Sequence, residues 1–414
     1  MRILYLHPQS WSGEYVILKQ LAAMGHAVCV LEEIRRAPFT ARRTSPDFLQ
    51  PGDGMATLWY DPHKGVEKLL TWPIDRFFKR AFEGRNLAHR MWLVRAAATA
   101  FKPDAIVSSE GFAYGIPASF LKRLGLLKPV LMVSYIGGDI LDCPEAQVGK
   151  RRTPMVSWLI RAALPGQDVT RATGPFIARH LLEEGADAQK IAIVPSHMAA
   201  DRSVVDGIHA RRAEVRKQVR AKLGVSEQTP LVVTLSRNMI GKGLHVLAAA
   251  WPAISASIPG IRWLLCGPHN DWLDKGVFPP LRAAGLQDTM LQTGALEGAG
   301  VFEHLAAADL HLNPSLCEGL NMVTVEAAGV GTPTITTDGT GIAEWINNSA
   351  CGKVVPAGDV VALADATVDA LRDSTMLSLW GERSRAMSLD FECSRVAGLL
   401  VAALAPRNGQ ATHP

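Results

Sequence analysis

Short runs of Val, Ile and Leu alternate with longer amphipathic stretches along the whole chain. In the first half, four apolar runs predict strands buried on both faces: Arg2–His7, Ala27–Glu32, Asp104–Ser108 and Val130–Tyr135. Such strands form parallel sheets that helices cover on both sides. The intervening stretches, such as Glu14–Met24 and Ala113–Leu124, have the spacing expected of the helical crossovers.

The same alternation restarts near residue 231 and predicts a second set of strands: Leu231–Ser236, Ile261–Cys266, Met290–Thr293, Leu310–Asn313 and Thr334–Thr337. The highly charged segment 201–224 between the two sets is typical of a solvated helix that joins two domains. We therefore predict an α/β protein with two doubly wound, Rossmann-like domains that face a central cleft, where such folds bind ligands. The predicted parts are a first domain (1–198), a linker helix (199–228), a second domain (229–388) and a C-terminal helix and tail (389–414).

Composition narrows the class of protein. The 414 residues are 48% hydrophobic and 20% charged, which excludes a disordered chain, and the net charge of +4 is too small to indicate nucleic-acid binding. The longest apolar run, Val396–Ala405, is shorter than the ~20 residues of a membrane-spanning helix. His7-Pro8 interrupts the N-terminal apolar run, unlike a signal peptide. The six cysteines lack any C-x-x-C pair, so we expect buried reduced thiols and a cytoplasmic protein.

Several motifs are absent. No G-x-G-x-x-G follows the first strand, which argues against a nicotinamide cofactor. H-E-x-x-H and D-x-D do not occur, so no metal site is predicted. The chemistry that remains relies on charged side chains and backbone amides.

Two cations follow the first strand of the second set. Arg237 comes just after that strand, Lys242-Gly243 lies five residues later, and a helix is predicted over Leu244–Ser257. A guanidinium, an ammonium and the N–H groups at a helix start together suit a phosphate. The alternative is an ordinary solvated turn.

Two glutamates follow the strand that ends at Pro314. Glu318 lies in the loop, and Glu326 lies about one turn into a helix that is predicted to begin near Met322. A carboxylate accepts two hydrogen bonds side by side, so each Glu suits two neighbouring sugar hydroxyls. Two glutamates at this spacing are also common by chance. Farther on, Asp338 either lines the same cleft or caps a helix.

Four motifs follow one another in the second half of the chain: Arg237-x4-Lys242-Gly243, Pro314-Ser315-x2-Glu318-Gly319 with Glu326-Ala327, Gly331-x-Pro333 and Gly341-x2-Glu344. In this order they resemble the pattern of glycosyltransferase family 4. The resemblance implies a retaining hexosyltransferase of the GT-B fold, which transfers sugar from a nucleoside-diphosphate sugar without a metal or other cofactor. It covers most of the second domain and agrees more loosely with the first. We also expect the C-terminal helix to return to the first domain.

The resemblance also implies roles for individual residues. Arg237 and Lys242 would hold the diphosphate, Glu318 the transferred sugar, and Glu326 the ribose. The amides of Leu320 and Asn321 would meet the sugar, and those of Met322 and Val323 the phosphates. Gly13 would let a first-domain loop approach the diphosphate, and Gly319 would belong to the donor-binding loop. We count Arg237, Lys242 and Glu318 as the catalytic candidates and the remainder as donor-binding.

Three positions depart from the family pattern. The family usually has Gly where Asn321 stands, two glycines where Ser12-Gly13 stand, and often a His where Ile136 precedes Gly137-Gly138-Asp139. The group that activates the acceptor therefore stays open, and the candidates are Asp139, Glu110 and His7.

The donor base is expected to be uridine or guanosine, and the acceptor a glycan, a small molecule or a lipid-linked precursor of a polysaccharide. Two other functions remain open: a sugar-nucleotide epimerase of similar fold, and a non-catalytic protein that binds nucleotide sugars. Segment 64–95 is cationic and aromatic, so we expect either contact with an anionic membrane or an ordinary helix pair with aromatics in the core. Its cations are Lys64, Lys68, Arg76, Lys79, Arg80, Arg85, Arg90 and Arg95.

Overall fold

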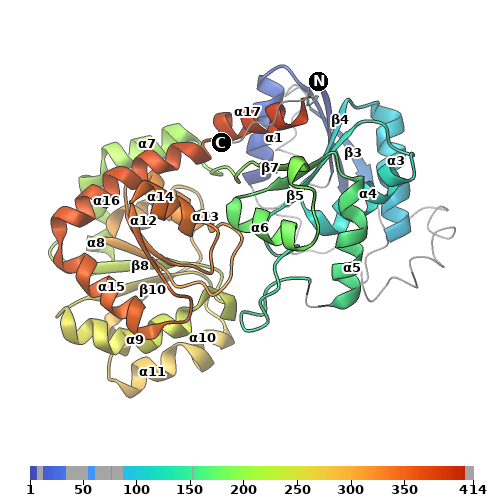
Figure 1. The fold of residues 1–414 in the computed structure, drawn as a ribbon. Helices are drawn as coiled ribbons and strands as arrows, with labels where there is room; N and C mark the ends of the chain where they lie inside the picture. The colour runs from blue at the N-terminus through green and yellow to red at the C-terminus, as the bar shows by residue number, and fades with distance from the viewer. Residues whose placement is uncertain (7–12, 34–54, 61–75, 77–86, 152, 406–414) are drawn as a thin grey trace. The chain divides into compact units, whose positions relative to one another are not determined.

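The computed structural model describes residues 1–6, 13–33, 55–60, 76, 87–151 and 153–405. The chain divides into two compact units, each built around a parallel sheet (Figure 1). Unit 1 comprises residues 1–142, 149–199 and 393–414, and unit 2 comprises residues 143–148 and 200–392.

The sheet of unit 1 has seven parallel strands in the order β3-β2-β1-β4-β5-β6-β7. Their bounds are β1 (Arg2–Leu6), β2 (Ala27–Glu33), β3 (Met55–Tyr60), β4 (Ala105–Ser108), β5 (Val130–Tyr135), β6 (Val169–Ala172) and β7 (Ile191–Ile193). The α-helices of unit 1 are α1 (Gly13–Ala23), α3 (Leu87–Phe101), α4 (Ile116–Arg123), α5 (Pro154–Ala163), α6 (Pro175–Glu183) and α17 (Cys393–Leu404). The four strands predicted for this half are confirmed, with ends that differ from the predicted ones by at most one residue.

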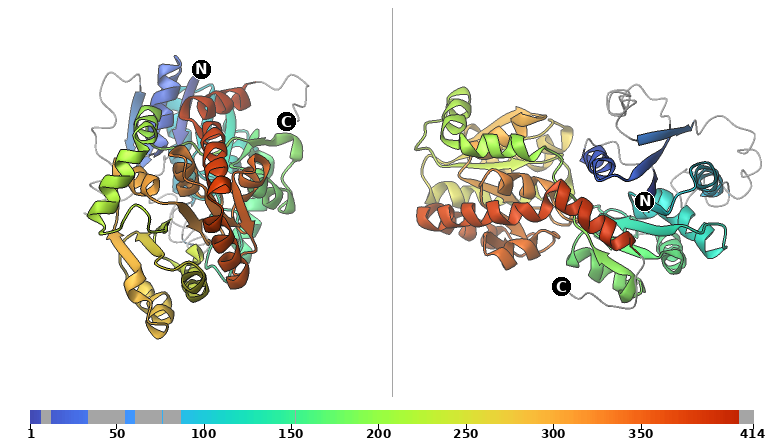
Figure 2. Two further views of the ribbon diagram at one scale, coloured as in Figure 1. Left: turned by 90° about the vertical axis from the view of Figure 1, so that its left-hand side faces the viewer. Right: turned by 90° about the horizontal axis from the view of Figure 1, so that it is seen from above.

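The C-terminal helix α17 belongs to unit 1, as expected, and packs beside α1 (Figure 2). Val396 and Leu400 of α17 share a buried cluster with Leu18 of α1 and Val28 of β2. The two ends of the chain therefore contribute to one hydrophobic core.

The sheet of unit 2 has six parallel strands in the order β10-β9-β8-β11-β12-β13. Their bounds are β8 (Leu231–Leu235), β9 (Arg262–Cys266), β10 (Met290–Gly294), β11 (Leu310–Asn313), β12 (Thr334–Thr337) and β13 (Gly352–Val355). This is the strand order of the classical dinucleotide-binding fold, in which the direction of the connections reverses between the two central strands. Here those strands are β8 and β11.

Helices cover both faces of this sheet. On one face, α9, α10, α11 and α15 pack with the strands around the fully buried Trp251 and Trp263. On the other face, α12 contacts α7, α8 and α13 (Figure 1). The bounds are α7 (Arg202–Ala210), α8 (Arg212–Lys222), α9 (Leu244–Ser257), α10 (Asp271–Gly276), α11 (Phe278–Ala283), α12 (Ala299–Ala307), α13 (Met322–Gly329), α14 (Ala343–Ser349), α15 (Val360–Arg372) and α16 (Ser374–Met387).

The charged segment between the two series is not the solvated linker helix that the sequence suggested. It forms α7 and α8, both part of unit 2. Arg212, Arg216 and Arg220 point into the unit, where Arg212 Nη1 donates to the Gly331 carbonyl at 2.8 Å and Arg220 Nε to the Ala307 carbonyl at 2.9 Å. Charge density misled the prediction because guanidinium groups can bind several carbonyl groups at once while their stems are buried.

We predict that Arg220→Ala lowers the free energy of unfolding by about 3 kcal/mol, the scale for breaking a buried ion pair. Arg220 is 0% exposed and its Nη2 lies 2.9 Å from Asp309 Oδ2, while three further carbonyl groups accept from its Nη1. Urea denaturation of the full chain measures the change in the free energy of unfolding. The control is Lys217→Ala on the exposed side of α8, expected to stay within about 0.5 kcal/mol of wild type; equal effects of the two substitutions would contradict this account.

Candidate functional site

The candidate residues of unit 2 gather where the carboxyl ends of β8 and β11 lie side by side. Arg237 and Lys242 are in the loop after β8, and Glu318 is in the loop after β11. Crossovers from these two strands run in opposite directions, and open sheets of this kind bind ligands at such a switch point. The topology thus brings the basic and acidic groups predicted from sequence to one edge of one sheet.

Backbone hydrogen bonds join three neighbouring loops at this edge. Leu316 N–H donates to the Gly241 carbonyl at 2.9 Å, which ties the β11–α13 loop to the β8–α9 loop. Glu318 N–H donates to the Gly339 carbonyl, and its own carbonyl accepts from Gly341 N–H, each at 3.0 Å. The backbone on both sides of Glu318 is therefore fixed.

Close approach of these loops requires glycine at three positions, Gly339 and the two motif positions Gly243 and Gly341. A Cβ at Gly243, whose φ is +65°, would lie 1.8 Å from the Pro314 carbonyl oxygen. A Cβ at Gly341 would lie 1.9 Å from the Gly319 carbonyl oxygen. Any larger residue would push the loops apart, which explains these two glycines of the sequence motif.

Lys242 and Glu318 form an ion pair, with Nζ 2.5 Å from Oε1. The side chains are only 16% and 23% exposed, so each charge has lost most of its water and depends on the other. Burial alone would raise the pKa of Glu318, but Lys242 and the hydrogen bonds from Asn321 and Ser315 outweigh it and hold the pKa below its usual value. The carboxylate is ionised at neutral pH.

The second oxygen of Glu318 faces two neutral side chains. Asn321 Nδ2 donates to Oε2 at 2.7 Å, and Ser315 Oγ lies 3.1 Å from the same oxygen. Behind them Asn313 Oδ1 accepts from both Ser315 and Asn321. Asn313 could not be recognised from the sequence, because its position at the end of the buried strand β11 is equally typical of a core residue.

Helix α13 begins directly after this network, at Met322 as predicted. The first N–H groups of a helix have no partner within the helix, and Asn321 satisfies one of them by accepting from Thr324 N–H at 2.8 Å. The N–H groups near Met322 and Val323 remain suited to an anion, with the positive end of the helix dipole behind them. Gly319 and Leu320 are buried beside them.

Glu326 and Arg237 differ from the ion pair in having no counter-charge. Glu326 is half-buried on the second turn of α13, and burial raises its pKa to about 7. No hydrogen bond or ion pair of either side chain occurs in the described part of the chain. Arg237 is exposed, whereas Glu326 has lost water without gaining a partner.

In unit 1, the acceptor-side candidates that can be located hold the backbone. The carboxylate of Glu110 accepts from the N–H groups of Phe112, Ala113 and Tyr114 at the start of a π-helical turn (Gly111–Gly115). Asp139 accepts from Gly111 N–H at 2.7 Å, and burial raises its pKa to about 6. His7 lies outside the described residues.

Gly13 is the first residue of α1, and a buried histidine binds it. His197 Nε2 donates to the Gly13 carbonyl, and burial lowers the pKa of His197 to about 4, so the imidazole is neutral. Sequence alone did not indicate His197, since contact with a residue 184 positions away leaves no local pattern.

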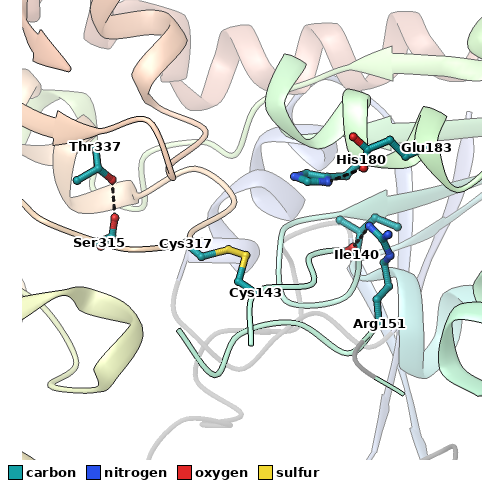
Figure 3. Close-up of a disulfide and its surroundings, with 8 residues drawn as sticks. All are labelled: Ile140, Cys143, Arg151, His180, Glu183, Ser315, Cys317 and Thr337. Atoms are coloured by element: carbon teal, nitrogen blue, oxygen red, sulfur yellow. Dashed lines mark hydrogen bonds and ion pairs between the residues drawn. A yellow bond between two sulfur atoms is a disulfide. The ribbon is translucent and has the colours of Figure 1, made fainter. Parts of the chain in front are cut away.

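A disulfide between Cys143 and Cys317 corrects the expectation that all six thiols are reduced. Cys317 directly precedes Glu318, and Cys143 begins the segment 143–148, which is part of unit 2 (Figure 3). Ser315, two residues before Cys317, is held from the other side by Thr337 Oγ, which donates to its carbonyl. The expected cytoplasmic location rested partly on reduced thiols, and that argument no longer holds.

The segment 143–148 folds back on itself and packs on the β8–α9 loop. Cys143 and Val148 exchange both backbone hydrogen bonds, at 3.0 and 3.1 Å. A Cβ on Gly241 would lie 2.9 Å from the Ala146 carbonyl oxygen. The disulfide therefore joins a third piece of chain to the two loops that carry Lys242 and Glu318.

The cationic segment 64–95 falls mostly outside the described residues, so the two interpretations given for it stay predictions. Of its cations, Arg90 is buried, donates to the Ala113 carbonyl at 3.1 Å and stacks on the Tyr114 ring. Arg90 is therefore part of the packed interior of unit 1. In the part of the chain that the structure describes, no helix is long and apolar enough to cross a membrane, and no cluster of three or more candidate metal ligands occurs.

Two family models match the chain. The model described as glycosyl transferases group 1 matches residues 229–373, and the model described as glycosyl transferase 4-like domain matches residues 15–197. The two together cover most of both units.

Two relatives point the same way. The GDP-mannose-dependent alpha-(1-6)-phosphatidylinositol monomannoside mannosyltransferase of Mycobacterium tuberculosis is 28% identical over 271 residues, 63% of this chain and 68% of that one. The putative colanic acid biosynthesis glycosyltransferase WcaL of Escherichia coli is 26% identical over 308 residues, 73% and 69% of the two chains. Among solved structures, Anabaena HepE in complex with UDP and glucose has a TM-score of 0.71 at 18% identity, covering 98% of this chain and 99% of that one.

We predict that breaking the disulfide destabilises unit 2, because the bond closes a loop of 174 residues and long loops gain the most from closure. Cys143→Ser should lower the unfolding free energy by about 2–5 kcal/mol. Dithiothreitol should do the same to the wild type and nothing further to the variant. Thermal denaturation measures both effects, and a wild type indifferent to the reductant would contradict the prediction.

Proposed function

The chain belongs to the family 4-type glycosyltransferases of the GT-B fold, and from that premise we propose that it is a retaining hexosyltransferase. It moves a hexose from a nucleoside-diphosphate sugar to an acceptor hydroxyl. The observation that carries this proposal is the Lys242–Glu318 pair at the carboxyl ends of β8 and β11. A nucleoside diphosphate and a sugar need a cation and a carboxylate side by side, and this pair supplies both.

The diphosphate lies against Lys242, Arg237 and the start of α13. Lys242 has two further N–H groups to donate, Arg237 has a free guanidinium in the described structure, and the N–H groups of Met322 and Val323 complete the anion site. When the bond between sugar and phosphate breaks, negative charge grows on the leaving diphosphate. Fixed cations and dipoles that already point at that position stabilise it by several kcal/mol.

The sugar and ribose lie against carboxylates. Glu318 and the backbone around Gly319, Leu320 and Asn321 bind the transferred hexose. Glu326, which lacks a counter-charge, accepts from the ribose hydroxyls. In unit 1, His197 holds the Gly13 carbonyl in place, and the role of Gly13 toward the diphosphate stays a prediction.

Retention follows from attack of the acceptor on the face that the diphosphate leaves, where a leaving phosphate oxygen takes the acceptor proton. This route needs no carboxylate of the protein to take the acceptor proton. It therefore agrees with the contacts of Glu110 and Asp139, whose carboxylates hold backbone N–H groups. Analysis of the anomeric configuration of the product by NMR tests it. Because Lys242, Arg237 and helix α13 supply the positive charge, we propose that the reaction needs no metal and that excess EDTA leaves the rate unchanged.

The relatives indicate the substrate class. One is named as a GDP-mannose-dependent phosphatidylinositol monomannoside mannosyltransferase, and another as a putative colanic acid biosynthesis glycosyltransferase. We propose a UDP- or GDP-linked hexose as donor and a lipid-linked or polysaccharide precursor as acceptor. We propose a cytoplasmic location, with the membrane as the source of a lipid-linked acceptor; in that compartment the Cys143–Cys317 bond would be exposed to reduction.

A thermal-shift panel of UDP-, GDP- and ADP-sugars tests the proposed function directly. A donor at 100 times its Kd adds about 2.7 kcal/mol of stability. We expect one base and one sugar to stabilise the protein above the others. Conversion of the donor without an acceptor would indicate an epimerase, and no stabilisation by any nucleotide would contradict the proposal.

We predict that Lys242→Ala and Arg237→Ala each lower turnover by a factor of about 100 or more, the scale for losing one charge-stabilising group. Lys242→Ala also removes the partner of Glu318, so it should raise the pKa of that carboxyl. Arg237→Ala removes no contact of the described structure and serves as the cleaner variant. Release of nucleoside diphosphate from the stabilising donor measures turnover, and wild-type rates in either variant would count against the roles assigned here.

The pH dependence of donor binding should report Glu326. Its pKa is raised to about 7, and only the ionised form accepts hydrogen bonds from both ribose hydroxyls. Affinity for the nucleotide sugar should therefore rise about tenfold from pH 6 to pH 8, because the ionised fraction rises by that factor. The diphosphate of a nucleotide sugar has no titrating group in this range, which makes it the right probe.

Glu326→Gln should bind the same donor more weakly at pH 8 and without this pH dependence. The substitution removes a carboxylate that is buried without a partner, so it should also raise the melting temperature at pH 8. Calorimetric titration and thermal denaturation measure the two effects. An unchanged pH profile in Glu326→Gln would assign the titration to another group.

A further inference from the structure

The side chain of Asn321 uses all of its hydrogen-bonding capacity inside the site. Its Oδ1 accepts from Thr324 N–H and from Thr324 Oγ, both at 2.8 Å. Because a backbone N–H can only donate, this contact fixes which end of the amide is oxygen. The two hydrogens on Nδ2 then point to Glu318 Oε2 at 2.7 Å and to Asn313 Oδ1 at 3.1 Å.

The backbone at Asn321 suits this arrangement. Asn321 has φ +76°, a left-handed conformation that Asn tolerates better than most residues and that Gly adopts without cost. The residue is buried, with 6% of its surface exposed. The carboxamide is therefore a fixed part of the site and not a surface side chain that happens to touch Glu318.

These contacts leave Glu318 with one open position. Oε2 faces Asn321 on one side and Ser315 Oγ, at 3.1 Å, on the other. Ser315 has a single proton, which it shares between Glu318 and Asn313, but its oxygen occupies that side of Oε2 in either case. Oε1 contacts only Lys242 among the described residues, so one of its lone pairs is free.

The free lone pair of Glu318 Oε1 and the free N–H groups of Lys242 can together bind one hydroxyl. A hydroxyl that donates to Oε1 can also accept from one of the free N–H groups of Lys242. Two neighbouring hydroxyls, which the sequence analysis assigned to this carboxylate, would need both oxygens. Oε2 can serve a second hydroxyl only if Asn321 releases it.

We propose that Asn321 is a positioning residue that sets sugar specificity: it holds Glu318 Oε2 and thereby limits the carboxylate to one hydroxyl of the transferred sugar. The inference rests on the proposed function, since it requires a sugar at Glu318. The proposed substrate is a hexose of which a single hydroxyl binds Glu318 and contributes most of the affinity at this carboxylate.

The test compares nucleotide sugars that lack single hydroxyls. The probes are UDP-glucose and GDP-mannose, each with its 2-, 3-, 4- and 6-deoxy forms, and the readout is the ratio of the Kd of each deoxy form to that of its parent. For the wild type, with whichever parent it binds, one position should cost about tenfold or more, the range for a hydrogen bond to a charged group. Its two neighbouring positions should cost less than about threefold.

Asn321→Gly keeps the backbone conformation and removes the amide. Glu318 Oε2 then becomes available, so the loss should spread over two adjacent positions and the ratio at the first should fall severalfold. Asn321→Asp keeps the bond to Thr324 N–H but places a second carboxylate against Glu318. It should weaken binding of the parent sugar nucleotide about tenfold while binding of the free nucleoside diphosphate changes little.

Thr324→Val is the matched control, because it removes only the hydroxyl contact to Asn321 and leaves the backbone N–H that orients the amide. Its ratios should equal those of the wild type. A general loss of folding would lower affinity for every probe alike, whereas the proposal requires a change in the ratios.

The outcomes separate the two proposals. A wild type that binds neither parent sugar nucleotide nor any other donor of the thermal-shift panel contradicts the proposed function itself. A wild type that binds a parent and loses equal affinity at two neighbouring positions overturns the role of Asn321 alone. A single dominant position that persists unchanged in Asn321→Gly overturns it as well.

Discussion

The ion pair between Lys242 and Glu318 is the interaction on which the site of unit 2 depends. It joins the loops after β8 and β11, the two strands between which the connections reverse direction. A carboxylate with little access to water needs a partner of opposite charge, and a nearby ammonium is the strongest available. The backbone bonds of Leu316 and Glu318 to the neighbouring loops keep this geometry in the free protein. The groups that meet the donor are thus arranged before it arrives, and little ordering remains to oppose binding.

Much of the fold could be predicted from the sequence because parallel strands covered on both faces must be apolar throughout. Runs such as Val130–Tyr135 and Leu310–Asn313 match the observed strands residue for residue. The loop after β11 was also recognisable, since Pro314, Glu318 and the start of a helix follow one another within a few residues. These features depend on neighbours in the chain, and local pattern is sufficient for them.

What could not be predicted depends on residues that are distant in sequence. Nothing near Cys143 indicates a disulfide bond to Cys317, and nothing near Arg220 indicates an ion pair with Asp309. The hydrogen bond from Asn321 to Glu318 is local, yet its consequence depends on Asn313, which a buried strand places behind it. Sequence therefore proposed which side chains carry the chemistry, and only the structure assigned how many hydrogen bonds each still has to offer.

In the proposed donor site, the same accounting of hydrogen bonds suggests how sugar and diphosphate are recognised together. Without a ligand, Glu318 neutralises Lys242. A nucleoside diphosphate that draws the ammonium toward itself would weaken the contact of Glu318 with its one ionic partner among the described residues, and this carboxylate is held away from water. A sugar hydroxyl that donates to Oε1 compensates for this loss. A nucleotide that carries the sugar would therefore bind Lys242 through its diphosphate and Glu318 through a sugar hydroxyl. The nucleotide alone would bind Lys242 and leave Glu318 without a full partner. The pair thereby favours the intact donor over the diphosphate product, and release of that product restores the contact between Lys242 and Glu318.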